Sequence, residues 1–302
     1  MTTSLSFSYR IVDVFTEVAL AGNPLAVLPD ARGIDDATMQ RLAREFNLSE
    51  TVFVLPPNGP AHVARLRIFT PAMEMRFAGH PTVGASATLL SLGLVAADCE
   101  TFILEELIGD VLIRVDRSND PVKFWLTTPP IEFGPQFDPE LCARVLGLSA
   151  GDLLGPAPQR LSAGNPIMYI ALRDSEAVDR AWIDLAGVRE LHGGAASTDC
   201  IFVFTPTKTG AYSRMFAPEL GVIEDPATGS ATGPLAAYMM HHGLAQSRDG
   251  TILLSEQGVK MGRRSILHIA VHGEGGSEGI EVGGSVVEFA RGTISLPAPV
   301  PA

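Results

Sequence analysis

The residues best suited to acid–base chemistry in this 302-residue sequence stand where strands and helices are expected to begin. Glu50 begins an apolar strand, and His80 stands in a Gly-His pair just before a helix expected over 82–94. A carboxylate at the rim of an apolar strand can have its pKa raised by desolvation, which suits a general base. Histidine is the side chain best matched to proton transfer near neutral pH. These two residues are therefore the first candidates for catalysis.

A second group of candidates surrounds the start of a helix expected over 231–241. Asp225 stands shortly before the Gly-Ser pair formed by Gly229 and Ser230, and Gly79 holds the matching glycine position in the first half. The free N–H groups of a first helical turn, with the positive end of the helix dipole, bind carboxylate oxygens. Glycine lets the backbone approach a ligand closely. Both helix starts therefore predict donors for a small anion, although a serine in this place could equally be only a helix cap.

The two helix starts belong to a longer internal repeat. Four segments of the first half recur in the second half in the same order, at offsets of 142 to 150 residues. The matching pairs are 22–24 with 164–166, 49–54 with 198–203, 67–71 with 214–218, and 79–82 with 229–232. Four collinear matches indicate a duplication, because ordinary reuse of strand patterns does not keep their order. If a pseudo-two-fold axis relates the two units, their helix starts face each other and hold a substrate between them.

The composition restricts the possible partners. The net charge is −12 and the pI is about 5.0, whereas nucleic acid and anionic membranes need a basic face. The basic pair Arg263–Arg264 is short and is expected to be solvated.

The sequence also restricts the possible cofactors and the location of the protein. The three cysteines are widely spaced, so they indicate neither a disulfide framework nor a zinc site. The sequence has no GxGxxG after a strand, no P-loop and no HExxH motif, and its first residues lack the apolar core of a signal peptide. We therefore expect a cytoplasmic enzyme with a small anionic substrate and with no metal, no cofactor, no nucleic acid and no membrane as partner.

The expected elements give an α+β protein. Helices are expected over 35–46, 82–94, 139–146 and 231–241. Strands are expected over 7–15, 51–55, 63–70, 101–104, 111–115, 122–127, 167–172, 200–204, 211–216, 252–255, 266–271 and 285–290. The strands are predicted from alternating or continuous apolar runs, and the helices are predicted from apolar residues that fall on one face.

Six short motifs stand in a specific order along nearly the whole chain. They are Asp-Val-Phe at 13–15, Gly-Asn-Pro at 22–24, Asn-Leu-Ser-Glu-Thr at 47–51, Arg-Ile-Phe-Thr-Pro at 67–71, Phe-Ala-Gly-His-Pro at 77–81 and Glu-Asp-Pro-Ala-Thr-Gly-Ser-Ala at 224–231. In this order they resemble the PhzF-like isomerase family of phenazine biosynthesis. The resemblance implies a diaminopimelate-epimerase-like fold. In that fold two similar domains from a duplication each curl a barrel-like, mostly antiparallel sheet around a central helix, and the active site lies in the cleft between them.

The expected domains follow the repeat. The N-terminal domain spans 1–122 and the C-terminal domain spans 123–285. By resemblance to the family, a last strand from about 286–302 returns to the N-terminal domain. Family members are homodimers that need no cofactor, so the resemblance predicts both properties here.

The resemblance also gives roles to the candidate residues. In the phenazine-pathway member a single glutamate moves a proton along a dihydro-hydroxyanthranilate, and its counterpart here is Glu50, as base and then as acid. The family's active-site histidine and aspartate match His80 and Asp225, which would orient the polar groups of the substrate and assist proton transfer. The residues expected to bind the substrate are Gly79, Gly229, Ser230 and Asn23.

Three functions are compatible with these residues. They are an isomerase acting on a small carboxylated substrate, a racemase or epimerase of an amino or hydroxy acid that uses two bases, and a non-catalytic ligand-binding protein. Retention of the whole set of acid–base and donor residues argues against the third. Diaminopimelate epimerases use two cysteines where this chain has His80 and Ser230, which argues against a two-thiol racemase. Asp199 matches Glu50 in the repeat and could be a second base, but a structural or surface role is favoured.

Overall fold

The computed structural model describes residues 4–118, 120–191, 200–246 and 248–297. Within these ranges, eighteen strands form one hydrogen-bonded network. The same ranges contain six α-helices. The helices are α1 (Asp36–Phe46), α2 (Gly79–Ser91), α3 (Pro139–Val145), α4 (Ser175–Arg180), α5 (Leu185–Leu191) and α6 (Gly229–His241). The strands are β1 (Ser4–Val14), β2 (Asn23–Leu28), β3 (Glu50–Leu55), β4 (Ala64–Phe69), β5 (Glu74–Met75), β6 (Thr101–Glu106), β7 (Gly109–Asp116), β8 (Lys123–Thr127), β9 (Glu132–Gln136), β10 (Gln159–Ser162), β11 (Pro166–Ala171), β12 (Cys200–Thr207), β13 (Gly210–Ala217), β14 (Val222–Asp225), β15 (Ile252–Gln257), β16 (Ser265–His272), β17 (Gly279–Gly284) and β18 (Val286–Pro297).

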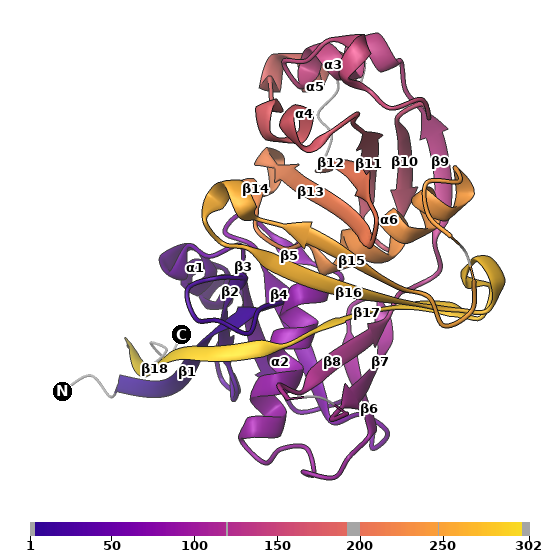
Figure 1. Ribbon diagram of the computed structural model, residues 1–302. Coiled ribbons are helices and arrows are strands. Elements are labelled where there is room, and N and C mark those ends of the chain that lie inside the picture. The colour runs from indigo at the N-terminus through magenta and orange to yellow at the C-terminus, as the bar shows by residue number, and fades with distance from the viewer. Residues whose placement is uncertain (1–3, 119, 192–199, 247, 298–302) are drawn as a thin grey trace.

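The elements are arranged in two parts. In Figure 1 the lower part contains β1 to β8 with α1 and α2, and the upper part contains β9 to β13 with α3, α4 and α5. Strands β15, β16 and β17 run across the middle, between the two parts. None of the helices in the described ranges is long and apolar enough to cross a membrane.

The two parts pair their strands in the same order. In the lower part β2 is parallel to β3, β3 is antiparallel to β4, and β4 is parallel to β6. In the upper part β11 is parallel to β12, β12 is antiparallel to β13, and β13 is parallel to β15. Each series continues into antiparallel neighbours, β6–β7–β8 and β15–β16–β17. This shared order follows the internal repeat of the sequence, while the domain limits at 122 and 285 remain predictions.

The last strand returns to the first. Strand β18 pairs with β1 along its length, and the two strands lie side by side near the chain ends in Figure 1. Strand β17 pairs with β8, so the sheet continues from the second half of the chain into the first. These pairings tie the late part of the sequence to the early part, and any motion of one part relative to the other has to bend them.

Helices α2 and α6 are buried because their residues are small and apolar. Ten of the thirteen residues of α2 and nine of the thirteen of α6 are buried. A Cβ atom on Gly84 would lie 2.5 Å from Cδ2 of Leu25, and one on Gly233 would lie 2.3 Å from Oγ1 of Thr128. Larger residues would push the helices off the strands around them. A helix that is apolar on every side is stable only when it is surrounded in this way.

Both buried helices begin earlier than the sequence predicted. Helix α2 begins at Gly79, three residues before the expected start, and α6 begins at Gly229, two residues before it. The difference places His80 and Ser230 inside the first helical turn. Pro81 does not delay the start of α2, because a proline in the first turn has no N–H that an intrahelical bond would use.

Several elements were not expected from the sequence. They are β2, β5, β9, β10, β14, β17, α4 and α5. Strand β2 has no alternation, because almost all of its residues are buried. Strand β9 is short and contains Gly134 and Pro135, and α4 and α5 have only six and seven residues. Short elements are held by tertiary packing and leave little periodicity to detect.

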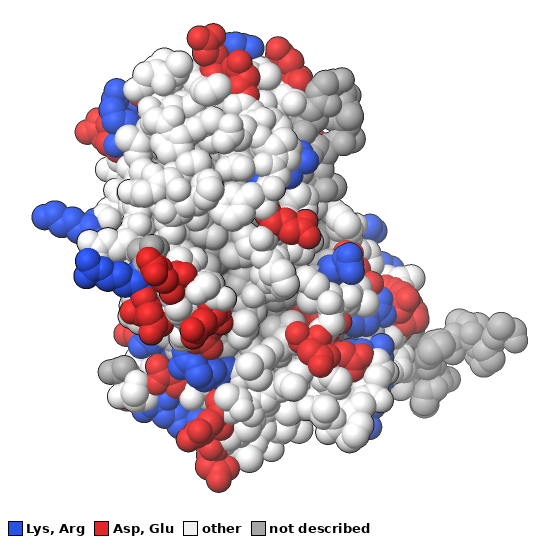
Figure 2. Space-filling view, turned by 90° about the vertical axis from the view of Figure 1, so that its right-hand side faces the viewer, with Lys and Arg blue, Asp and Glu red and all other residues white. Residues whose placement is uncertain are grey.

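Charged side chains of both signs share the surface. On the face shown in Figure 2, acidic and basic groups are interspersed over the middle and lower regions, and much of the upper region is uncharged. No broad basic area is visible among the described residues on that face. The surplus of acidic groups is therefore spread over this face.

Candidate active site

The N-termini of α2 and α6 touch through their first glycines. A Cβ atom on Gly79 would lie 2.6 Å from the carbonyl carbon of Gly229 and 2.6 Å from the backbone nitrogen of Ser230. Real Cβ atoms do not approach backbone atoms so closely, so this contact requires glycine. The structure thus brings together the two Gly-led helix starts that the sequence analysis singled out.

Four backbone N–H groups at these helix starts have no acceptor within the described part of the chain. They belong to Gly79, His80, Gly229 and Ser230. Such groups have no partner inside their own helix. The dipoles of α2 and α6 also place partial positive charge at the same point. The two helix ends can therefore act together on one carboxylate, or on negative charge that develops on an oxygen.

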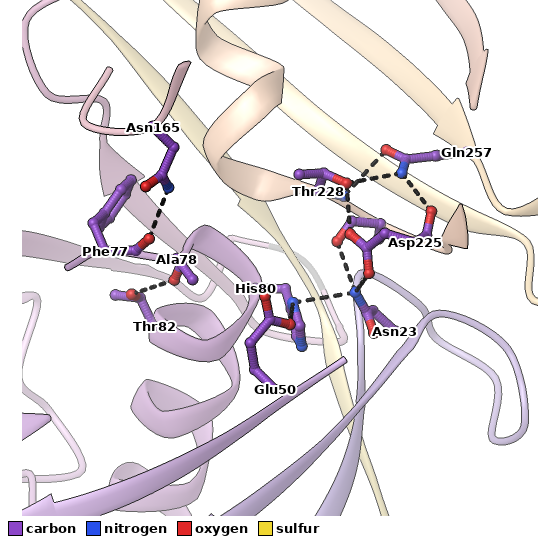
Figure 3. Close-up of polar contacts among 11 residues, drawn as sticks. Asn23, Glu50, Phe77, Ala78, His80, Thr82, Asn165, Asp225, Thr228 and Gln257 are labelled. Carbon is purple, nitrogen blue, oxygen red and sulfur yellow. Dashed lines mark hydrogen bonds and ion pairs between the residues drawn. The ribbon is translucent and has the colours of Figure 1, made fainter. Parts of the chain in front are cut away.

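Asn23 joins the two halves of the site. Its side chain is buried at the start of β2, and its Nδ2 donates to Oδ1 of Asp225 at 2.8 Å and to the carbonyl of Ala227 at 2.9 Å. The same nitrogen lies 3.1 Å from Nδ1 of His80 (Figure 3). The carboxylate of Asp225 and the carbonyl of Ala227 fix the orientation of the Asn23 amide, because a flipped amide would place its oxygen against these two acceptors. Asn23 therefore orients the residues around it, and it does not line the cavity described below.

Asp225 is the last residue of β14, and donors surround its carboxylate. Thr228 donates to Oδ2 at 2.5 Å, and Asn23 donates to Oδ1. Gln257 holds the same turn, because its Nε2 donates to the carbonyl of Asp225 at 2.7 Å and to Oγ1 of Thr228 at 3.0 Å. Burial raises the pKa of Asp225 to about 6, and the hydrogen bonds from Thr228, Ser49 and Asn23 oppose that rise.

Glu50 is the first residue of β3 and is the least satisfied acid of the site. Its side chain is 14 % exposed, and its Oε2 has no hydrogen-bond partner. Burial, together with the nearby charge of Asp225, raises the pKa of Glu50 well above its ordinary value. A carboxyl group of this kind keeps its proton into a higher pH range, which is what a group that both takes and returns a proton requires.

His80 lies behind Glu50. It is 2 % exposed, and burial lowers its pKa to about 3, so its imidazole is neutral. Its Nδ1 lies 3.3 Å from Oε2 of Glu50 and 3.1 Å from the amino nitrogen of Asn23. Which atom donates at Nδ1 depends on the imidazole tautomer, because the two amide hydrogens of Asn23 are already directed to Asp225 and Ala227. The imidazole is uncharged, so it offers no ion pair that would lower the pKa of Glu50.

A cavity of about 190 Å³ lies in front of these residues. Glu50, Asp225 and Ser230 line it, whereas Asn23, Gly79, His80 and Gly229 are not part of its wall. The rest of the wall is largely apolar and includes Met73, Met75, Met215, Leu220 and Val222. The predicted residues therefore separate into a front group that faces the cavity and a rear group that holds the front group in place.

The second Gly-Asn-Pro motif also reaches the cavity. Asn165 lines it, and its Nδ2 donates to the carbonyl of Phe77 at 2.9 Å (Figure 3). Asn165 is the repeat partner of Asn23, so this motif was visible in the sequence even though no role was assigned to it. Asp199, the repeat partner of Glu50, lies outside the described residues.

Two ion pairs that the sequence analysis did not identify fix the chain before each helix. Arg67 on β4 holds both carboxylate oxygens of Glu74 at 2.7 Å. Arg214 on β13 holds both oxygens of Glu224, at 2.9 and 2.8 Å. The arginines were visible as the repeated Arg-x-Phe-x-Pro motif, but their partners lie at different spacings in the two halves. Paired contacts of this kind fix orientation as well as position.

The site includes no evident metal centre. Within the described ranges, no group of three or more His, Cys, Asp or Glu side chains is placed to hold a metal ion. The polar side chains of the site lie within hydrogen-bonding distance of one another.

Comparison with known proteins agrees with the motifs. The model of the PhzC–PhzF family, described as phenazine biosynthesis-like proteins, matches residues 12–292. The chain belongs to this family. The match covers both helix starts, the residues behind the cavity and the returning strand β18 up to residue 292.

Relatives that match this chain over nearly their whole length are named as isomerases. An uncharacterised isomerase of Mesorhizobium japonicum is 40 % identical, over 96 % of this chain and 99 % of the relative. The trans-2,3-dihydro-3-hydroxyanthranilate isomerase of Pseudomonas fluorescens is 36 % identical, over 96 % and 99 %. A solved structure of a predicted epimerase from Pseudomonas aeruginosa superposes with a TM-score of 0.80 at 35 % identity, over 95 % of this chain and 99 % of that one. This protein is therefore an isomerase of the PhzF family with the fold of that family.

Proposed function

We propose that this protein is a cofactor-independent isomerase that moves a proton between carbons of a small carboxylated substrate. Glu50 is the base and then the acid. The observation that carries the proposal is the position of Glu50. Its carboxyl group lines the cavity, lacks a hydrogen bond at Oε2 and has a raised pKa, beside four unpaired backbone N–H groups.

The proposed reaction has two balanced steps. Ionised Glu50 takes a proton from a substrate carbon, so a C–H bond breaks, an O–H bond forms, and the electron pair moves into the conjugated substrate. The N–H group of Ser230, which lines the cavity, and the positive ends of the α2 and α6 dipoles stabilise the resulting negative charge, and one such donor is worth on the order of 10²–10³ in rate. Glu50 then returns the proton to a different carbon.

The rear residues serve this cycle by holding proton positions. Neutral His80 places its Nδ1 3.3 Å from Oε2 of Glu50, behind the carboxyl group, and so limits where that group can move between the two steps. Asn23 connects His80 to Asp225, so the helix starts and the base keep one geometry. Asp225 and Ser230 reach the substrate at the cavity wall, where they orient its polar groups.

The same proposal covers architecture and assembly. The repeated motifs and the shared strand order support two domains from a duplication, with the cavity as the cleft between them. We also propose a homodimer and a small anionic substrate, as the family resemblance implies. The relative from Pseudomonas fluorescens is named for its substrate, trans-2,3-dihydro-3-hydroxyanthranilate, which is the first compound to test here.

Hydrogen exchange in D₂O, followed by NMR, tests the proposal. The wild type is expected to introduce deuterium at a ring carbon of trans-2,3-dihydro-3-hydroxyanthranilate or of another substrate in a panel of amino and hydroxy acids. Glu50→Gln removes the proton carrier but keeps the shape of the side chain, so exchange should fall by at least about 10³-fold.

Glu45→Gln provides the matched control. Glu45 is an exposed glutamate on α1, so the same chemical change there should leave exchange intact. Deuterium exchange that persists in Glu50→Gln would show that Glu50 is not the proton carrier. If no substrate of the panel exchanges with the wild type, and unsaturated dicarboxylic acids do not exchange either, the reaction type is wrong.

An epimerase is a second candidate, because a second carboxyl group with a raised pKa lines the same cavity. Asp225 could serve as the opposite base in a two-base mechanism, and a structural relative is named as a predicted epimerase. The same experiment distinguishes the two reactions, since an epimerase places deuterium at a stereocentre without moving a double bond.

A further inference from the structure

Arg76 is a cation on the cavity wall whose side chain has no partner among the described residues. It stands three residues before α2, its side chain is exposed, and it lines the same cavity as Glu50. Its backbone carbonyl accepts a hydrogen bond from the N–H of Ile108 at 3.0 Å, which fixes the main chain at this point. Within the described ranges its guanidinium makes no ion pair, hydrogen bond or ring contact. It is also the only Lys or Arg among the described residues of the wall.

The neighbouring arginines differ from Arg76 because they are already paired. Arg67 holds Glu74 and Asp36, and Arg214 holds Glu224 together with three backbone carbonyls. In a chain with a net charge of −12, acidic partners are abundant. An arginine that none of them engages, at the wall of a cavity, is therefore available to a ligand.

The acids of the wall do not cancel this charge. Glu74 is neutralised by Arg67. Asp225 directs one oxygen to Asn23 and the other to Thr228. Glu50 holds its proton because burial and Asp225 raise its pKa. Arg76 is therefore the positive charge that the described part of the wall offers to a ligand, while the carboxylate of Asp225 is buried and occupied by its hydrogen bonds.

We propose that Arg76 forms a second oxyanion subsite, which selects substrates that carry another acidic group besides the carboxylate held at the helix starts. The proposal rests on the proposed function, because it uses the same cavity and the same first anion site. The apolar residues Met73, Met75 and Met215 line the rest of the wall and would contact the uncharged body of the substrate. A guanidinium suits this role because it binds a planar carboxylate through two parallel hydrogen bonds. The substrate class is therefore a small unsaturated dianion.

Binding of simple acids tests the subsite without turnover. Calorimetry would compare succinate, glutarate and adipate with butyrate, valerate and hexanoate, on wild type, Arg76→Met and Arg76→Lys. In the wild type at least one dicarboxylate should bind about three- to tenfold more tightly than the monocarboxylate of the same length. Arg76→Met should abolish that preference, and Arg76→Lys should keep only part of it, because an ammonium group lacks the paired geometry.

Arg41→Met is the control for the change in net charge. Arg41 is an exposed arginine on α1 that does not line this cavity, so the variant should keep the wild-type preference. A wild type without the preference, or an Arg76→Met variant that retains it, overturns the subsite. A phosphonate analogue of the preferred acid shows whether a tetrahedral oxyanion is accepted in place of a carboxylate.

The two proposals fail in different experiments. Glu50→Gln should still prefer dicarboxylates, because its substitution leaves Arg76 and the helix starts unchanged. Loss of deuterium exchange without loss of the binding preference supports both roles. A preference for dicarboxylates without deuterium exchange on any substrate would support the subsite and contradict the isomerase mechanism.

Discussion

Two carboxyl groups share the same buried environment at the residue scale, and they do not titrate independently. Burial raises the pKa of Glu50 and of Asp225, and the Asp225 charge raises that of Glu50 further. The apparent pKa values therefore belong to the pair. At low pH Glu50 holds its proton, and the ionised base becomes available as the pH rises. The pH dependence of the reaction consequently reports the charge of Asp225.

Substitution of Asp225 by Asn should move the acidic limb of the pH profile. The value of kcat/KM for proton transfer should rise with pH in the wild type, through an apparent pKa well above that of an ordinary glutamate. In Asp225→Asn the opposing charge is absent, so the limb should lie at lower pH. The overall rate should also fall, because the hydrogen bonds from Asn23 and Thr228 are altered. The measurement is kcat/KM across the acidic and neutral range.

A purely structural role for Asp225 would lower the rate at every pH and leave the limb in place. Asp98→Asn is the control, since it removes one negative charge from an exposed turn. A limb that moves equally in Asp98→Asn and Asp225→Asn would show a general effect of net charge and contradict direct coupling.

The residue types at the site could be predicted from the sequence. Which of these residues face the cavity and which lie behind it could not. The motifs indicated Glu50, His80 and Asp225 as one group, and the structure places the three together. His80 was expected to orient the substrate, yet it lies behind Glu50 and does not line the cavity. Which residue of a loop faces solvent depends on packing from other elements, which no single motif encodes. For the same reason Gln257 on β15 gave no signal.

At the element scale, the contact between α2 and α6 decides the geometry of the donors. The repeat predicted two helices with glycine and a polar residue at the start, and both helices are present. The start of α2 was placed three residues too late and that of α6 two residues too late, because apolar periodicity does not extend into a first turn that begins with Gly and a polar residue. The sequence also could not show that the two glycines touch, since that contact joins segments 150 residues apart.

A methyl group at Gly79 should therefore separate the helix starts. In Gly79→Ala the new Cβ would meet the backbone of Gly229 and Ser230 at 2.6 Å, and no flexible side chain can move aside. We expect a loss of about 1–3 kcal/mol in the free energy of unfolding, and a larger effect on kcat, because the N–H groups of both helices shift. Denaturant unfolding and kcat are the two measurements.

Gly155→Ala is the matched substitution for this test. A Cβ at Gly155 meets nothing within 4 Å and its backbone is not left-handed, so stability should change by no more than about 0.5 kcal/mol. If Gly79→Ala is as stable and as active as Gly155→Ala, the helix starts have room that the structure does not show.

At the scale of the whole molecule, the first and second halves are joined by strand pairing and by one buried ion pair next to the site. Asp13 on β1 is almost fully buried and accepts from Nη2 of Arg263 at 2.5 Å and from the N–H of Leu20 at 2.7 Å. Arg263 also donates to the carbonyls of Ala21 and Gly22. The sequence analysis expected Arg263 to be solvated with Arg264. That interpretation was wrong for Arg263, because its partner is 250 residues away in the chain.

Arg263→Met should therefore destabilise the protein strongly. The substitution leaves the Asp13 carboxylate buried without its partner, which costs about 3–5 kcal/mol in comparable cases. It also frees the loop before Asn23, so kcat should fall as well. Arg264→Met is an adjacent control, since Arg264 is 64 % exposed where it pairs with Glu256 and should contribute no more than about 1 kcal/mol.

Combining Arg263→Met with Asp13→Asn separates two effects. One is the cost of an unpaired buried carboxylate, and the other is the loss of the contact between the two halves of the chain. The double variant should recover part of the free energy of unfolding that Arg263→Met loses, because the unpaired carboxylate is gone. Its kcat should stay low, because the backbone carbonyls of the loop before Asn23 still lack their donor. Denaturant unfolding of all four proteins gives the coupling energy. Full recovery of kcat along with stability would mean that the pair only neutralises charge and does not position Asn23.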